Sequence, residues 1–230
     1  FSVGGVDQST TIDENGRPII HGSAFKGALR NIVREQEKKE GQMEKTKEYV
    51  KCIINEILEK YRSEDIVKTE KIEKMILNLE NKVNSKDLKA EYIFGMEGIN
   101  GLPRMFCSDF RVIESKDKKI DDYFLIDTKT CIEEVNGNII SNPRTYKVIK
   151  PGIKFEGIIS FYNPFFMTNE DETEKIETPI EKELRDALGM FNEGLYGIGN
   201  SRSRGYGQIR VEFDDEPKEG EYDDKVRNKA

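Results

Sequence analysis

The spacing of apolar residues changes along this chain, and the change limits it to a fold that combines helices and strands. Within 50–61 and 72–83, apolar side chains recur every three or four residues, which is typical of amphipathic helices. From Phe106 onward, apolar and polar residues alternate, which is typical of half-buried strands. The sequence therefore predicts an α+β architecture.

The predicted elements follow the order of a ferredoxin-like, or RRM-like, core. Residues 1–5 end a first strand, and we expect part of that strand to precede Phe1. Ser23 is the predicted N-cap of the first helix. The last helix is predicted to begin at Pro179 and to end before Gly194, because these residue types favour the two ends of a helix. The other predicted strands are 106–112, 123–126, 153–162 and 209–213.

Three further segments extend this core within what we expect to be a single domain, 1–230. The segment 41–90 is predicted to be a helical insertion, with its Lys and Glu residues on a solvated face. The segment 131–147 is predicted to be a β-hairpin, because Asn136-Gly137 lies between apolar ends. The acidic segment 214–230 is predicted to be a flexible tail.

The composition excludes several classes of protein. No apolar run approaches the roughly 20 residues that a membrane-spanning helix needs, and we expect a cytoplasmic protein without a membrane partner. Three widely spaced cysteines are expected to be free thiols, and a single histidine argues against hydrolase triads. The net charge of −7 is unusual for a nucleic-acid binder, but the segment 201–210 holds three arginines and no acid.

The glycine-rich segment 194–207 is the first candidate for a binding site. Its five glycines allow the backbone to approach a ligand and to direct amides at it. Its arginines match phosphate oxygens, and its tyrosines can stack on bases. The alternative is a flexible connection between a helix and a strand. The candidate RNA-binding residues here are Gly197, Gly199, Asn200, Ser201, Arg202, Ser203, Arg204 and Tyr206.

The segment 16–30 is the second candidate. A helix that begins near Ser23 offers free amides and the positive end of its dipole to an anion. Lys26 and Arg30 are four residues apart and therefore share a helix face, which suits an RNA backbone. The alternative is a basic face that only contacts solvent.

These two segments resemble motifs of the RAMP (repeat-associated mysterious protein) superfamily. Residues 16–30, Gly-Arg-Pro-Ile-Ile-His-Gly-Ser-Ala-Phe-Lys-Gly-Ala-Leu-Arg, resemble its signature Pro-x-Ile-Pro-Gly-Ser-Ser-Leu-Lys-Gly-Ala-Leu-Arg. The segment 194–207 resembles its C-terminal glycine-rich loop, and 2–7 is similar to the glycine-rich turn that precedes the signature. The stretches 92–95 and 151–155 are also similar to the family, and 40–90 is not covered.

The resemblance implies a ferredoxin-like fold and a role in a type III CRISPR effector complex. It is closest to the backbone subunits, which repeat along the guide RNA (crRNA). The implied partners are crRNA, target RNA and other effector subunits, including copies of the chain itself. In such subunits a hairpin thumb separates segments of the guide from the target, and 131–147 is the candidate thumb.

Some of these subunits cleave target RNA with an aspartate in the loop before the signature helix. That loop is shorter here, so Asp7 is the first candidate for the catalytic residue and Asp13 the second. Asp7 is also the candidate ligand for a divalent metal such as Mg²⁺. The alternative is that Asp7 caps a turn and that Asp13 begins the turn at Asn15-Gly16.

His21 replaces the second proline of the family signature and supports a rival hypothesis. In that hypothesis the chain is an endoribonuclease that processes repeat RNA without a metal and uses His21 as a general base. The alternative for a lone histidine is packing or hydrogen bonding. A third hypothesis is a capping or scaffold subunit that neither repeats nor cleaves.

Overall fold

The structure is a computed structural model that describes residues 8–63, 69–84, 88–96, 105–113, 118–135, 138–161, 179–200 and 202–214. Asp7, Ser201, Asn136-Gly137 and the tail from 215 lie outside these residues. The helices are α1 (Gly22–Gln36), α2 (Glu44–Ser63), α3 (Glu70–Asn84) and α4 (Pro179–Gly189), with short 3₁₀ helices η1 (Ala90–Phe94), η2 (Ile120–Tyr123), η4 (Met190–Glu193) and η5 (Arg202–Arg204). The strands are β1 (Gln8–Ser9), β2 (Ile19–Ile20), β3 (Met105–Cys107), β4 (Phe110–Val112), β5 (Phe124–Val135), β6 (Asn138–Ile149), β7 (Phe155–Glu156) and β8 (Ile159–Phe161).

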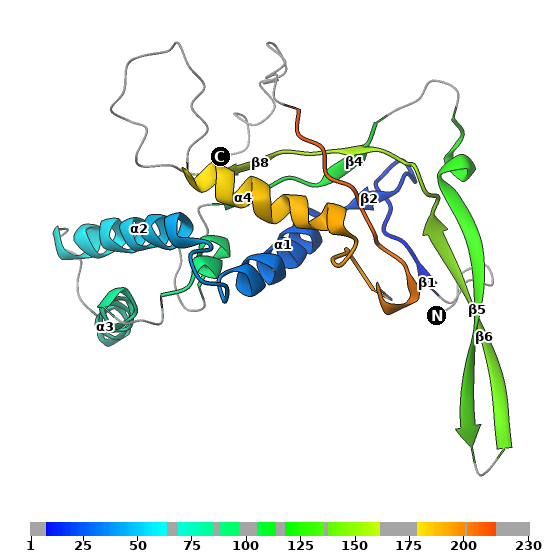
Figure 1. The fold of residues 1–230 in the computed structure, drawn as a ribbon, viewed down its shortest axis with the longest axis horizontal. Helices are drawn as coiled ribbons and strands as arrows, with labels where there is room; N and C mark the ends of the chain where they lie inside the picture. Colours follow the sequence, from blue (N-terminus) through cyan, green and yellow to red (C-terminus); the bar gives the residue numbers. More distant parts are fainter. Residues whose placement is uncertain are drawn as a thin grey trace.

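The main hydrophobic core lies among the helices. It joins the apolar faces of α1, α2 and α4 to η1, and α4 runs beside α1 in Figure 1. The two helices predicted within 41–90 are present as α2 and α3, and α2 contributes to this same core. Residues that are at most 1% exposed include Leu29, Ile32, Val33, Ile53, Ile54, Leu79, Ile93 and Phe191.

Helix α2 begins against α4, and a carboxylate from α4 holds that end in place. Glu183 accepts hydrogen bonds from the amides of Lys45 (3.0 Å) and Thr46 (2.8 Å) and from the Thr46 hydroxyl (2.7 Å). The first amides of a helix have no partner inside the helix, so this contact satisfies two of them. The start of α2 is therefore fixed by tertiary structure.

The prediction that Ser23 caps the first helix is wrong. Helix α1 begins at Gly22, and His21 occupies the N-cap position without a side-chain capping bond. The Gly22 amide instead donates a 2.8 Å hydrogen bond to Asp109, which is 87 residues away in the sequence. Gly22 also approaches the strand closely, because a Cβ there would lie 2.4 Å from the Cys107 carbonyl oxygen.

The described strands form three small sheets, in the orders β1-β6-β5, β2-β4-β7 and β3-β8. The mixed α+β prediction is confirmed by these elements. A single four-stranded ferredoxin-like sheet is not among the described residues, so that part stays a prediction. Strands β4 and β7 pair antiparallel, and the long hairpin lies between them in the sequence.

The continuous strands predicted at 106–112 and 153–162 are each interrupted. Cys107 pairs with Ile159, and Arg111 pairs with Glu156. Three residues lie between Cys107 and Arg111, but only two lie between their partners Glu156 and Ile159. The strand that contains Cys107 and Arg111 therefore carries one extra residue, which forms a β-bulge at 108–110. The bulge reverses the alternation, because Phe106 is 61% exposed whereas Val112 is buried. It also places Asp109 against α1.

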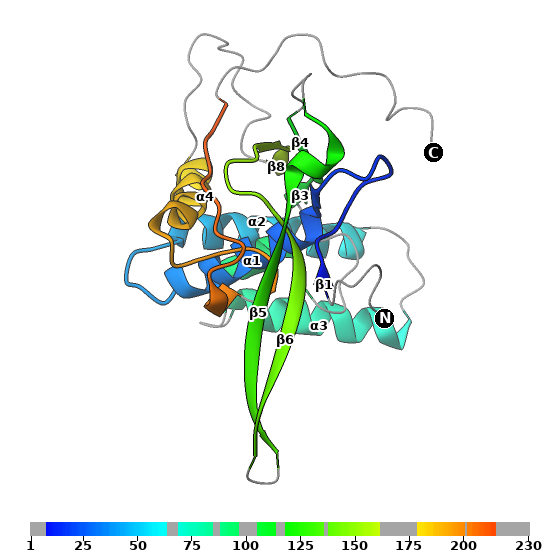
Figure 2. The ribbon, with the colours of Figure 1, turned by 90° about the vertical axis from the view of Figure 1, so that its right-hand side faces the viewer.

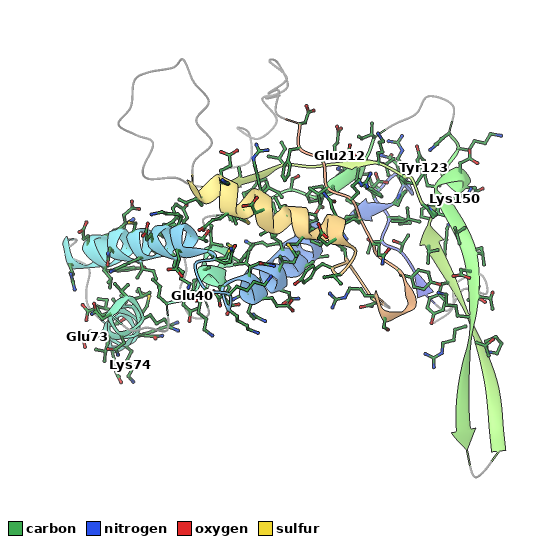
Figure 3. All side chains as sticks on the ribbon, in the orientation of Figure 1. Glu40, Glu73, Lys74, Tyr123, Lys150 and Glu212 are labelled. Atoms are coloured by element: carbon green, nitrogen blue, oxygen red, sulfur yellow. The ribbon has the colours of Figure 1, made fainter. Side chains whose placement is uncertain are left out.

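Strands β5 and β6 form one long antiparallel hairpin of twelve paired positions, from Phe124↔Ile149 to Val135↔Asn138. The separate strand predicted at 123–126 and the hairpin predicted at 131–147 are therefore parts of one ladder. Figures 1 and 2 show the hairpin extending away from the helices. Tyr123 and Lys150 mark its attached end (Figure 3), where the Lys150 amide donates to the Tyr123 carbonyl (2.9 Å).

The strand predicted at 209–213 does not form. This segment runs beside η4, where the Asn192 side chain donates to the Val211 carbonyl (3.1 Å) and accepts from the Val211 amide (2.7 Å). Ile209 and Val211 pack on the main core, as an inward-facing pair would. The side-chain amide of Asn192 thus takes the place of a neighbouring strand.

Candidate nucleic-acid interface

The glycine-rich segment is a narrow loop that is closed at its base. Gly197 and Gln208 form an antiparallel bridge, and the Ile198 amide donates a 2.8 Å hydrogen bond to the Gly207 carbonyl. Gly207 has a φ of +72°, and a Cβ there would lie 1.9 Å from the Ile198 carbonyl oxygen. Glycine is therefore required for the two sides of the loop to approach each other.

The tip of the loop presents small and charged residues. Asn200, Arg202 and Ser203 are exposed, and Arg202 to Arg204 form the short helix η5. The Gly205 amide donates to the Arg202 carbonyl (3.0 Å), which closes the turn. Ser201 lies outside the described residues. Asn200, Arg202 and Ser203 thus lie on the surface, above a fixed base.

Two tyrosines anchor the loop to different parts of the fold. The Tyr196 hydroxyl donates to Glu35 near the end of α1, and this bond raises the pKa of Tyr196 to about 12. The Tyr206 hydroxyl donates to Asp127 on β5. The loop therefore connects α1 to the attached end of the hairpin, and it is seen between them in orange in Figure 1.

The aromatic ring of Tyr206 is occupied within the chain. The Lys129 ammonium lies 4.1 Å from its centroid, and the Tyr146 ring lies at a centroid distance of 5.8 Å. Tyr206 is half-buried, and Tyr146 is buried. Tyr206 thus joins the loop to the hairpin, whereas the sequence alone predicts only that its ring could stack on a base.

Lys26 and Arg30 lie on one flank of α1 and both bond within the chain. Lys26 donates to the Met105 carbonyl (3.1 Å), and burial lowers the pKa of its ammonium. Arg30 donates to Glu91 (3.1 Å) and to the Gly95 carbonyl (3.3 Å). Arg34, which was not predicted, continues the same flank one turn later and also donates to Glu91 (2.9 and 2.6 Å).

The loop and the basic flank border one exposed face of α1. Arg30 and Glu35, the partner of Tyr196, are five residues apart, which is roughly 140° around an α-helix. Ser23, Gly27 and Asn31 fall within that sector and are exposed. A Cβ on Gly27 would meet no atom within 4 Å, so the face is open there. The two sequence segments thus meet along one helix.

The N-terminus of α1 is partly occupied within the chain, which our expectation of free amides did not include. Asp109 accepts the Gly22 amide, and this hydrogen bond is the main reason that the pKa of Asp109 is lowered. The other oxygen of Asp109 lies 3.6 Å from His21 Nδ1, and both side chains are nearly half exposed. The carboxylate therefore takes one of the amides that a phosphate was expected to bind, and it lies beside His21.

Asp13 holds a turn. One carboxylate oxygen accepts the amides of Asn15 and Arg17, both at 2.9 Å, and the other lies 3.6 Å from Arg111. The predicted turn at Asn15-Gly16 is thus present, with the Asp13 side chain only 6% exposed. Asp7 lies outside the described residues and directly precedes β1, where Gln8 pairs with Tyr146 of β6.

The described residues do not fit a metal centre. Nowhere in the described part of the chain do three His, Cys, Asp or Glu side chains gather as metal ligands. Both oxygens of Asp13 already have partners in the protein. The expected Mg²⁺ ligand, Asp7, is outside this set. Among the described helices, none is long and apolar enough to cross a membrane.

Comparisons with known proteins identify the family of this chain. No curated protein matches the sequence. The family model for the RAMP superfamily matches residues 2–210, which include the exposed face of α1, the long hairpin and the glycine-rich loop. Because the match covers most of the 230 residues, the chain belongs to the RAMP superfamily.

Proposed function

We propose that this chain is a guide-RNA-binding subunit of a type III CRISPR effector complex. RAMP membership supports a CRISPR-associated RNA-binding function. The observation that carries the proposal is that the closed glycine-rich loop and the basic flank of α1 border the same exposed helix face. The loop supplies amides, neutral donors and arginines beside this face and the flank supplies further cations, a combination that suits a single-stranded phosphate backbone.

The long hairpin is the proposed thumb. It extends away from the helices, and its attached end is joined to the glycine-rich loop through Tyr206 and Asp127. This link supports a model in which the loop holds the guide and the hairpin separates its segments. We also propose a ferredoxin-like core, a cytoplasmic location and contacts with other effector subunits, including copies of this chain.

Binding of single-stranded RNA tests the proposal. The double variant Arg202→Ala, Arg204→Ala should lower the affinity and flatten its salt dependence, by about 0.7 in the log–log slope for each phosphate that the protein no longer neutralises. The matched control is Arg62→Ala, Lys74→Ala, which removes two cations from α2 and α3. Equal affinities of the two double variants in fluorescence anisotropy would contradict the proposal.

Cleavage of target RNA with Mg²⁺ is a further part of the proposal, and it depends on Asp7. The described carboxylates do not support a metal site, so the test is made on Asp7 itself. Complementary RNA should be cleaved by the wild-type complex and not by Asp7→Asn, while both bind guide RNA equally. Equal cleavage by the variant would exclude Asp7 from catalysis.

His21 favours a second candidate function, the processing of repeat RNA without a metal. Asp109 lies 3.6 Å from Nδ1 of His21, an arrangement that can hold an imidazole in one orientation as a general base. Incubation of the protein with precursor repeat RNA in EDTA separates the two functions. Cleavage that disappears in His21→Ala would support the processing enzyme, and absence of cleavage would support the guide-binding subunit.

A further inference from the structure

Three cations surround one buried carboxylate beside α1. Oε2 of Glu91 accepts Nε of Arg30 (3.1 Å) and two N–H groups of Arg34, from Nε (2.9 Å) and from the terminal nitrogen (2.6 Å). Lys89 lies 4.0 Å from the other oxygen, Oε1. The Glu91 side chain is 8% exposed, whereas those of Arg30, Arg34 and Lys89 are 37%, 46% and 50% exposed.

The cluster carries more positive charge than the carboxylate can neutralise. Burial alone would raise the pKa of Glu91, but the hydrogen bonds from Arg34 and Arg30 hold it below its usual value, so the group is an anion. A second carboxylate, Glu37, accepts the Ala90 amide (2.8 Å) and acts on Arg34, so three cations and two anions leave an excess of one positive charge. Several N–H groups offset the cost of burying this carboxylate, but Lys89 stands at the limit of ion-pair distance, 4.0 Å, and part of the positive charge is left for a ligand.

The two guanidinium groups keep donors for a ligand. Each has five N–H groups, and the bonds to Glu91 and to the Gly95 carbonyl use two on each arginine. Because a buried anion fixes both side chains, a ligand would lose little rotamer entropy when it binds them. Guanidinium groups held in this way match the oxygens of a phosphate.

We propose that Arg30, Arg34 and Lys89 bind one phosphodiester group of a single-stranded RNA and that Glu91 is their positioning residue. The site rests on the proposed function, because the RNA is taken to lie along the exposed face of α1. It adds two residues, Arg34 and Lys89, that lie outside the glycine-rich loop and outside the family signature in 16–30.

The test uses the full-length chain and a fluorescein-labelled oligouridylate. Arg34→Ala should weaken binding about tenfold, as expected for one charge-assisted hydrogen bond, and should lower the salt slope by about 0.7. Arg34→Lys keeps the charge but removes the paired N–H groups, and should bind nearly as weakly as Arg34→Ala. Lys39→Ala, which removes an exposed cation just beyond α1, is the matched control and should bind like the wild type.

Glu91→Gln separates positioning from net charge. The change makes the chain more positive, so a role through net charge alone predicts tighter binding, whereas loss of positioning predicts weaker binding. Thermal unfolding monitors the fold of each variant. If Arg34→Ala and Arg34→Lys bind like the wild type while the loop variant at 202 and 204 binds weakly, this inference is overturned and the proposed function stands. Failure of the wild type to bind RNA would overturn both.

Discussion

The hydroxyl of Tyr206 donates a hydrogen bond to the carboxylate of Asp127, and this contact joins the glycine-rich loop to the attached end of the hairpin. The Lys129 ammonium covers the same ring, and Tyr146 packs beside it. Tyr206 thus links two segments that are 79 residues apart. It therefore helps to fix the position of the hairpin relative to the loop.

Tyr206→Phe should loosen this link without disturbing the core. The ring contacts are kept and one hydrogen bond to a carboxylate is removed, which costs about 1–2 kcal/mol in a half-buried position. Hydrogen exchange should become faster for backbone amides near Asp127 and Tyr146. Tyr196→Phe is the matched control, because it removes the bond to Glu35 and should leave exchange in the hairpin unchanged.

Asp109→Ala should destabilise the protein at neutral pH by about 1 kcal/mol, the usual cost of removing a helix cap. The pKa of Asp109 is lowered in the folded state, chiefly by the Gly22 amide. Its contribution is therefore complete above the unfolded pKa of about 3.9 and is lost as the pH falls through the lower folded value. Urea unfolding at a series of pH values should show the difference from the wild type shrinking in acid. A difference independent of pH would contradict this account.

Gly207→Ala should open the base of the glycine-rich loop. The new Cβ would meet the Ile198 carbonyl oxygen at 1.9 Å, and the residue would keep a φ of +72°. Gly199→Ala has a similar φ of +80° but meets no atom within 4 Å, so it carries only the backbone strain of about 1 kcal/mol. The unfolding temperature and the RNA affinity should both fall further for Gly207→Ala than for Gly199→Ala. Equal effects of the two changes would show that close approach is not required.

Gly27→Ala separates stability from binding. Gly27 lies in the interior of α1 with open space around it, so alanine should stabilise the helix by about 0.5–1 kcal/mol. If an RNA backbone lies along this face, the added methyl group should nevertheless weaken RNA binding. A variant that is more stable and binds equally well would place the RNA elsewhere.

Local patterns predicted the helices and the hairpin because each depends on neighbouring residues. The stripes within 50–61 and 72–83 became α2 and α3, and Asn136-Gly137 lies between the two long strands. The start of α1 was misplaced because its capping residue, Asp109, is remote in the sequence. The strand predicted at 209–213 does not form for a similar reason. Its inward-facing apolar residues pack on the main core, and the side chain of Asn192 bonds its backbone in place of a neighbouring strand.

The candidate site was predicted in part. Residue types indicated the loop and the basic flank, and the structure brings them to one helix face. Composition does not reveal which donors are already used within the chain, so the bonds of Lys26, Arg30 and Tyr206 could not be foreseen. For Glu91, the sequence offers one indication of a role at the site. It is an acidic residue directly before the stretch 92–95, which resembles the family.

The two strands of the hairpin are twelve residues long, so a rotation where the hairpin is attached moves its far end over a large distance. At about 3.3 Å per residue, the arm is about 40 Å long. A rotation of about 10° at its attached end would therefore move the far end by roughly 7 Å, more than the spacing between neighbouring strands. A small change in the position of the Tyr206 side chain would thus produce a displacement at the far end of the hairpin that is large enough to change its contacts.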